Sequence, residues 1–204
     1  MTKQRVLLLG ATGETGGSIL NGLLADTESF VRHICHYPRG GSDRAVQDVE
    51  ALVRPASINK PQVQELTKRG VKIRAVDIGG RLDDVVNSLA GVDVLISAID
   101  AMGQLAQLSL ATAAKQAGVK RFKEEVYQHI RRLYLPYTII DVGFWHQLSF
   151  PTLPSGRVDY AAVVMNNKNE IPAEGTMPTI LTDLRDIGPF VARIIKDPRT
   201  LNKL

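Results

Sequence analysis

Near its N-terminus the chain reads Arg5-Val-Leu-Leu-Leu-Gly10-Ala-Thr-Gly13-Glu-Thr-Gly16-Gly-Ser-Ile19. The apolar run that ends at Leu9 has the length of a strand, and its lack of alternation is typical of a parallel strand buried on both faces. A glycine-rich turn then leads into a helical pattern over residues 15–24. The order strand, turn, helix predicts the first unit of an α/β sheet.

Each glycine of this turn has a mechanical reason. Gly10 permits the tight turn after the strand, Gly13 lets a backbone approach a phosphate closely, and Gly16 lets the helix pack on the strand. The helix N-terminus offers unpaired N–H groups and a positive dipole end to a pyrophosphate, and Thr12 and Thr15 lie in the same turn. This context favours dinucleotide binding, with a purely structural glycine turn as the alternative.

The composition is that of an ordinary globular protein: 204 residues, 44% hydrophobic and 23% charged, with a formal charge of +4. No stretch approaches the ~20 apolar residues of a membrane span, and no signal peptide is visible, so we expect a cytoplasmic protein. The single cysteine excludes an internal disulfide, and the four histidines show no metal spacing, so we assign no metal. The basic pairs Lys120-Arg121 and Arg131-Arg132 are interpreted as solvated charges rather than a nucleic-acid patch.

Short apolar runs and helical segments alternate along the rest of the chain. We predict strands over residues 49–53, 71–76, 92–97, 119–122 and 137–142. We predict helices over residues 61–68, 82–89, 104–116 and 123–133. Because the links between them are short, the pattern predicts an α/β fold, a doubly wound parallel Rossmann sheet covered on both faces.

Residues 145–204 follow a different pattern, in which prolines and glycines separate short pieces. One strand is expected over residues 158–165 and one helix over residues 187–196, packed by its Ile/Val/Ala face. We therefore expect a dinucleotide-binding Rossmann domain over residues 1–144 and a partial, smaller substrate-side region over residues 145–204.

Five pieces of sequence occur here in a fixed order. They are Gly10–Ile19, Leu52-Val-Arg-Pro55 with Lys60, Ile96-Ser-Ala98, Ala117-Gly-Val-Lys-Arg-Phe122 and Leu135-Pro-Tyr-Thr138. Together they closely resemble the isoflavone-reductase-like branch of the NmrA-like proteins, which are atypical short-chain dehydrogenases. The resemblance covers nearly the whole chain except residues 31–47. It implies NADP(H) as cofactor, with the pyrophosphate on the turn from Gly10 to Gly16 and the 2′-phosphate on Arg54 and Lys60.

The residue type at the end of the second strand agrees with this cofactor. An NAD site would need a carboxylate there to accept hydrogen bonds from the ribose hydroxyls. The strand ends instead in Arg54, whose charge and fork geometry suit a phosphate dianion. The alternative is a solvated strand-end charge.

The spacing suggests an insertion over residues 31–47. The ribose-reading residue is expected ~20 positions after the glycine turn, but Arg54 lies 38 positions after Gly16. Removing the 17 residues from Val31 to Gln47 leaves 21. We therefore interpret this segment as an insertion relative to the family, with retained intron sequence as one origin and a functional glycine-rich loop as the alternative.

The chain departs from the family a second time after Phe122. There the family has a loop of roughly 15–20 residues before the next helix, and such loops are usually functional. In this chain Lys123 follows directly and is expected to begin that helix. Residues are therefore missing at this point relative to the family.

The resemblance also points to a catalytic lysine. The reductases of the family carry a lysine about a dozen residues before a Pro-Tyr-Thr, and Lys123 lies thirteen residues before Pro136. Desolvation beside a nicotinamide could shift the pKa of such a lysine, so that it serves as a general acid or base or orients a substrate oxygen. The alternative is an exposed charge at a helix start.

Two further groups of residues are expected at the site. Residues Ser97, Ala98 and Ile99 end the fourth strand and should line the cofactor at the carboxyl edge of the sheet. Residues Gly143, Phe144 and Trp145 follow the strand over residues 137–142 and should border the nicotinamide or the substrate. For Phe144 and Trp145, packing in the core is an equal alternative.

Two functions remain open from the sequence. The first is an NADPH-dependent reductase of the isoflavone reductase-like type, acting on a small, aromatic or phenolic substrate, with no nucleic-acid or membrane partner. The second is a non-catalytic NmrA-like sensor that binds the dinucleotide and regulates a protein partner. Lys123 favours the first, because regulatory members generally lack that lysine, and the missing residues after Phe122 argue against full activity. A third interpretation is that the chain is an inactive or unstable fragment that comes from an incorrect gene model.

Overall fold

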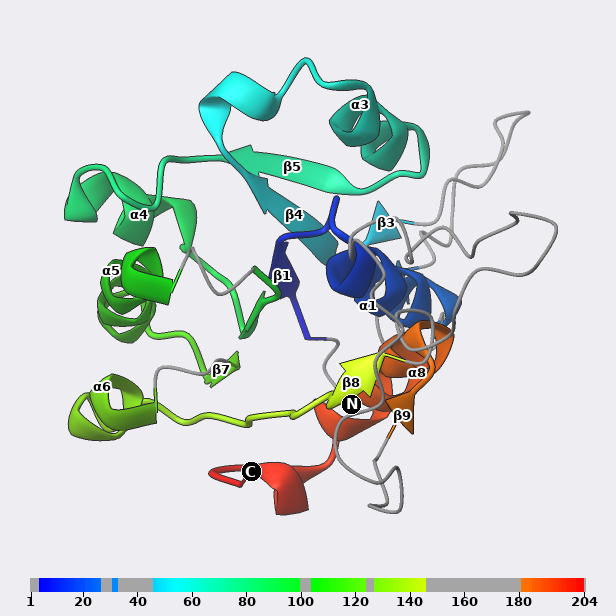
Figure 1. Ribbon diagram of the computed structural model, residues 1–204. Coiled ribbons are helices and arrows are strands. Elements are labelled where there is room, and N and C mark those ends of the chain that lie inside the picture. Colours follow the sequence, from blue (N-terminus) through cyan, green and yellow to red (C-terminus); the bar gives the residue numbers. More distant parts are fainter. Residues whose placement is uncertain are drawn as a thin grey trace, which may run out of the picture.

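A five-stranded parallel sheet forms the centre of the protein (Figure 1). The computed structural model describes residues 4–26, 31–32, 46–99, 104–123, 127–145 and 181–203. The strand order is β5-β4-β1-β6-β7, from β5 (Lys72–Ala75), β4 (Val49–Val53) and β1 (Val6–Leu9) to β6 (Val94–Ser97) and β7 (Arg121–Lys123). The chain therefore runs outward from β1 in both directions. This arrangement confirms the predicted doubly wound parallel sheet.

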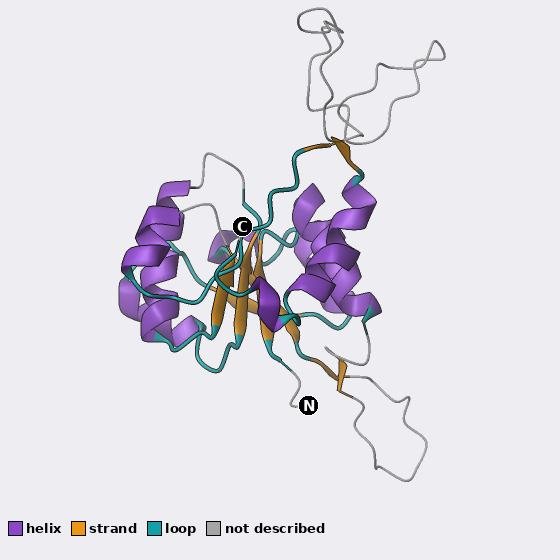
Figure 2. Cartoon of the chain, turned by 90° about the horizontal axis from the view of Figure 1, so that it is seen from below, coloured by secondary structure: helices purple, strands orange, loops and turns teal. Residues whose placement is uncertain are grey.

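Helices cover both faces of the sheet (Figure 2). The buried side chains of one face pack with α1 (Glu14–Ala25), α3 (Pro61–Lys68) and α8 (Leu184–Ile194). Those of the other face pack with α4 (Leu82–Ser88), α5 (Gln104–Gln116) and α6 (Tyr127–Arg132). Two short 3-10 turns, η1 (Pro55–Ser57) and η4 (Pro198–Thr200), complete the described helical residues.

Strand β1 explains why the apolar run near the N-terminus does not alternate. Val6 and Leu8 belong to the cluster of α1 and α8, whereas Leu7 and Leu9 belong to the cluster of α4, α5 and α6. All four side chains are buried. A central parallel strand is buried on both faces, which favours apolar residues at every position of β1.

The ends of the segment over residues 31–47 lie side by side. Strand β2 (Val31–Arg32) pairs antiparallel with β3 (Val46–Gln47), so the segment leaves and returns to the chain at one place. Such pairing is compatible with an inserted segment, because β4 begins at Val49, two residues after the segment ends. Residues 33–45 lie outside the described residues, and the insertion stays a prediction.

Residue Lys123 does not begin a helix, which corrects the sequence-based expectation. It is the last residue of β7, opposite Ile96 of β6, because the parallel ladder continues one residue past Phe122. Helix α6 begins only at Tyr127. Residues 124–126, between these two elements, lie outside the described residues.

Residues 137–142 are not a sixth strand of the sheet, which is a second correction. Their backbone bonds instead to the end of the described chain: Asn202 donates to the carbonyl of Tyr137 at 2.6 Å, and Ile139 donates to that of Lys203 at 3.0 Å. Thr138 also donates from its hydroxyl to the carbonyl of Thr200 at 2.9 Å. The apolar side chains Ile139, Ile140 and Val142 are buried or half-buried, as the pattern predicts. The backbone of the segment, however, pairs with residues more than 60 positions away in sequence.

Helix α8 packs in the same hydrophobic cluster as α1. Its buried residues Ile187, Val191 and Ala192, together with the C-cap residue Ile195, form the predicted Ile/Val/Ala face. The backbones meet where Gly22 faces Gly188, since a Cβ atom on Gly22 would overlap the backbone of Gly188 and one on Gly188 would overlap the carbonyl of Ser18. The predicted strand over residues 158–165 lies outside the described residues, and the domain boundary at residue 144 stays a prediction.

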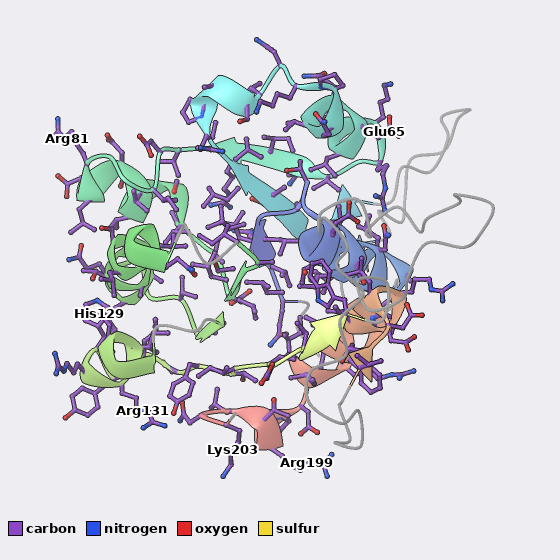
Figure 3. All side chains as sticks on the ribbon, in the orientation of Figure 1. Glu65, Arg81, His129, Arg131, Arg199 and Lys203 are labelled. Atoms are coloured by element: carbon purple, nitrogen blue, oxygen red, sulfur yellow. The ribbon has the colours of Figure 1, made fainter. Side chains whose placement is uncertain are left out.

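Charged side chains lie at the rim of the molecule. Figure 3 shows Glu65, Arg81, Arg131, Arg199 and Lys203 pointing away from the sheet. Within the described ranges, no helix has the length and apolar character needed to cross a membrane.

The contact between Gly22 and Gly188 predicts a strong asymmetry between two glycine substitutions. We expect Gly188→Ala to lower the free energy of unfolding by about 2 kcal/mol, because the added methyl group forces α8 away from α1. Gly17→Ala is the matched control, since the nearest atom to its Cβ would be the carbonyl oxygen of Ala11 at 3.9 Å. It should be neutral or stabilise by up to about 1 kcal/mol. Urea denaturation measures both, and equal effects would contradict the packing described.

The carboxylate of Asp93 predicts a pH-dependent stability. It accepts from the backbone N–H of Arg5 at 2.9 Å and from the ammonium of Lys120 at 2.6 Å. Burial would raise the pKa of Asp93, but these two donors outweigh burial and hold the pKa below its usual 3.8. The ionised carboxylate therefore stabilises the folded protein above pH 3.8. This stabilisation is lost as the pH falls through the pKa that Asp93 has in the folded state.

We therefore expect Asp93→Asn to lower the free energy of unfolding by about 0.5–1 kcal/mol near neutral pH, since Lys120 is exposed and solvent screens much of the attraction. The difference from wild type should shrink below pH 3.8. Urea denaturation across this range tests the expectation, with the exposed Glu65→Gln as control. A difference that does not change with pH would contradict it.

Candidate functional site

The turn between β1 and α1 is held by backbone contacts that exclude side chains. Gly10 has a φ of 88°, and a Cβ atom on it would overlap the carbonyl of Ala98. A Cβ atom on Gly16 would overlap the carbonyl of Gly10. Gly13 donates to the carbonyl of Gly10 at 2.9 Å, and Gly17 donates to that of Gly13 at 2.7 Å. The turn therefore brings the start of α1 directly beside the end of β1.

The first turn of α1 can bind an anion. Its N-cap residue is Gly13, which has no side chain to accept from the first N–H groups of the helix. Thr12 and Gly13 are exposed, and Thr15 is half-buried. Unpaired N–H groups and the positive end of the helix dipole suit a phosphate at this point.

Residues Arg54 and Lys60 lie on the β4 side of this turn. Leu52 pairs with Leu9, so Arg54 follows β4 at the same edge of the sheet at which Gly10 follows β1. Residues 54–60 fold back through η1, in which Ser57 donates to the carbonyl of Arg54 at 2.8 Å and Lys60 donates to that of Ser57 at 3.0 Å. Both basic residues are exposed at the two ends of one compact turn.

Residues Ser97, Ala98 and Ile99 lie on the opposite, β6 side of the turn. Ala98 donates to the carbonyl of Leu9 at 3.0 Å, and all three residues are half-buried. The side chain of Ile99 also lies beside the turn: a Cβ atom added to Gly10 would be 3.5 Å from the Cγ2 of Ile99. The structure thus brings the glycine turn together with both predicted flanks of a cofactor site, at the carboxyl edge of the sheet.

One polar residue of this edge was not predicted from the sequence. Gln107 of α5 accepts a hydrogen bond from the hydroxyl of Ser97 at 2.9 Å. It is only 1% exposed and shares the buried helix face with Leu110, Ala111 and Ala114. The sequence does carry a signal for Gln107: the helical period of α5 predicts an apolar residue at this position, and a glutamine stands there instead.

Residue Lys123 lies at the same carboxyl edge, next to β6. Its partner in the parallel ladder is Ile96, one residue before Ser97. The structure describes the backbone of Lys123 but not its side chain, so the role of Lys123 as the catalytic lysine stays a prediction.

The three residues expected to border the substrate lie further along the chain. Strand β8 (Phe144–Trp145) pairs in parallel with β9 (Leu181–Thr182). Trp145 is half-buried and packs against the cluster of α1 and α8, which favours the packing alternative for this residue. Gly143 is exposed, with a φ of 57°, and donates to the carboxylate of Asp141 at 2.8 Å. A substrate contact by Gly143, Phe144 or Trp145 stays a prediction.

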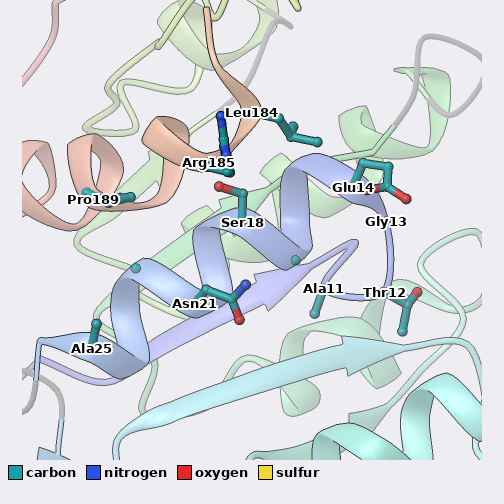
Figure 4. A pocket seen from close by; sticks show the side chains of 12 residues that line it. Ala11, Thr12, Gly13, Glu14, Ser18, Asn21, Ala25, Leu184, Arg185 and Pro189 are labelled. Carbon is teal, nitrogen blue, oxygen red and sulfur yellow. The ribbon is translucent and has the colours of Figure 1, made fainter. Parts of the chain in front are cut away.

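A cavity of about 440 Å³ continues from the glycine turn along the outer side of α1 (Figure 4). Residues 11–14 of the turn line one end, and Leu184, Arg185 and Pro189 of α8 line the other wall. The hydroxyl of Ser18, between the two helices, accepts from the backbone N–H of Gly188 at 3.1 Å. Arg185 is held by the carboxylate of Asp183 at 2.5 Å. Open volume therefore adjoins the anion-binding end of α1.

The fold and the edge of the sheet define a Rossmann-type α/β domain with a glycine-rich turn between β1 and α1. Comparison with known proteins agrees: residues 2–122 match the sequence model of the NmrA-like family. Because this match covers more than half of the chain, the chain belongs to the NmrA-like family. The resemblance found in the sequence motifs is confirmed.

Among its relatives, asnovolin J 5′,6′-dehydrogenase nvfM of Aspergillus novofumigatus is 40% identical over 97% of this chain. The chain spans 62% of the length of that relative. Phenylcoumaran benzylic ether reductase TP7 of Nicotiana tabacum is 24% identical over 98% of this chain and 67% of the relative. The match to nvfM runs over 218 positions, more than the 204 residues of this chain, so nvfM carries internal residues that this chain lacks.

Solved structures share the fold. AtPrR2 with NADP+ and (+)pinoresinol has a TM-score of 0.75 at 22% identity, covering 100% of this chain and 69% of that one. The binary complex of leucoanthocyanidin reductase with NADPH from Vitis vinifera has a TM-score of 0.68 at 20% identity, covering 98% and 67%.

Proposed function

We propose that this chain binds NADPH and forms the cofactor-binding part of a reductase that acts on a small aromatic or phenolic molecule. The observation that carries the proposal is the carboxyl edge of the sheet. There a glycine turn with uncapped helix N–H groups lies between two basic residues after β4 and the half-buried Ser97 at the end of β6. A dinucleotide bound across a doubly wound sheet needs contacts in that order.

The residues present fit NADPH better than NADH. Gly10 and Gly16 allow backbone contacts that no side chain would fit, and these contacts hold the N-terminus of α1 at the point where a pyrophosphate is expected. Arg54, which stands where NAD sites carry a carboxylate, offers paired N–H donors to a 2′-phosphate, and Lys60 adds a second positive charge. AtPrR2 and the leucoanthocyanidin reductase were solved with NADP+ or NADPH, which supports the same choice.

Residue Lys123 is the proposed catalytic residue. NADPH, when bound, supplies the hydride. The position of Lys123 beside the end of β6 puts it on the side of the glycine turn away from Arg54, where the nicotinamide half of a dinucleotide is expected. There the lysine would exchange a proton with the substrate oxygen or hold that oxygen in place. Gly143, Phe144 and Trp145 are proposed to border the substrate.

A second candidate function is a non-catalytic dinucleotide sensor that regulates a protein partner. The internal residues that nvfM carries and this chain lacks favour it. Both candidates share the NADPH site; they differ in turnover and in the protein partner that the sensor would regulate.

The first experiment titrates the chain with NADPH and with NADH by cofactor fluorescence. We expect NADPH to bind more tightly, and Arg54→Ala to weaken NADPH binding about 10- to 100-fold, since the charged bonds to the 2′-phosphate are lost. NADH binding should change little. Arg81→Ala is the matched control, because Arg81 is an exposed arginine that follows the neighbouring strand β5. Equal loss for both cofactors in Arg54→Ala would contradict a 2′-phosphate contact.

The second experiment separates the two candidates by turnover. With a panel of aromatic ethers and ketones, we expect Lys123→Ala to lower the rate of NADPH oxidation by a factor of about 10² to 10⁴. Its NADPH affinity should stay that of wild type. Lys68→Ala is the control, because it removes the same positive charge from an exposed lysine of α3, away from the proposed site. Tight NADPH binding without turnover of any substrate by the wild type would favour the sensor.

A further inference from the structure

Helix α5 carries a buried amide at the carboxyl edge of the sheet. Gln107 is 1% exposed, whereas the helix neighbours that share its face, Leu110, Ala111 and Ala114, are apolar and fully buried. Burying an amide costs free energy unless its polar atoms are hydrogen-bonded. The bond from the hydroxyl of Ser97 to the Oε1 of Gln107, at 2.9 Å, offsets part of that cost.

This bond fixes the direction in which the hydroxyl of Ser97 can act. A serine hydroxyl has one proton to donate and two lone pairs with which to accept. Its proton is used by Gln107, so Ser97 can only accept from a ligand at the edge of the sheet. Ser97 is half-buried and is the last residue of β6, at that edge of the sheet.

The position of Ser97 selects one half of the cofactor. Ser97 pairs with Leu9 of β1 on the side of the sheet opposite β4, after which Arg54 lies. A dinucleotide with its 2′-phosphate at Arg54 and its pyrophosphate at Gly13 would bring its nicotinamide half to Ser97. That half carries donors, the N–H groups of its carboxamide and the O–H groups of its ribose.

We propose that Gln107 is a positioning residue: it holds Ser97 as a hydrogen-bond acceptor for an N–H or O–H donor of the nicotinamide half. This inference rests on the proposed NADPH binding. Gln107 does not touch the cofactor and acts through Ser97.

The test is a double-mutant cycle on NADPH binding. Gln107→Met keeps the volume of the side chain but removes the hydrogen-bond acceptor. Ser97→Ala removes the hydroxyl and should disturb the packing less, because Ser97 is half-buried whereas Gln107 is buried. We expect each variant to weaken NADPH binding about five- to tenfold, and the double variant to bind no more weakly than Ser97→Ala. Binding of 2′,5′-ADP, which lacks the nicotinamide half, should stay unchanged in all three. Thr112→Val, which removes another hydroxyl bond of α5, should bind NADPH as the wild type does.

Three results would overturn the inference while leaving NADPH binding intact. They are wild-type NADPH affinity in Gln107→Met, additive losses in the double variant, and equal losses for NADPH and 2′,5′-ADP, which would mark Gln107 as a packing residue only. Absence of saturable NADPH binding in the folded wild type would instead overturn the proposed function, and this inference with it.

Discussion

The site depends on one close approach between backbones. At the end of β1 the carbonyl of Ala98 and the turn at Gly10 lie so near each other that no side chain fits between them, and Gly16 meets the carbonyl of Gly10 in the same way. These contacts fix the start of α1 against the middle of the sheet. The unpaired N–H groups of that helix end therefore have one fixed position relative to β4 and β6.

A second backbone contact holds α1 from the outside. Gly22 and Gly188 let α1 and α8 approach directly, and the hydroxyl of Ser18 bonds to the N–H of Gly188. Helix α8 comes from the far end of the chain, yet its apolar face completes the cluster under α1. The helix that follows the glycine turn is thus supported by a residue pair 166 positions apart in sequence. The cavity beside α1 has one wall from each helix.

Much of the fold could be predicted from the sequence, because local patterns determined it. The bounds of β4, α3 and α5 agree with the predicted ranges to the residue. In each of them an apolar period and a clear start or stop signal coincide. The prediction failed where pairing partners decide the structure. Lys123 extends β7 because β6 continues beside it, and residues 137–142 pair with the end of the described chain rather than with the sheet.

The sequence by itself determined the glycine turn, the alternation of strands and helices, and the presence of Arg54 and Lys60 after a strand, since each depends on residues close together in the chain. Only the tertiary structure decided which residues support that site. Ser97 and Gln107 meet because α5 packs across the end of β6. Likewise, buried Glu50 lies in a central strand because Arg74 of β5 pairs with it and bonds to the carbonyl of Ser88 at 2.6 Å. A buried polar group needs a partner, and the sequence does not reveal which distant residue supplies it.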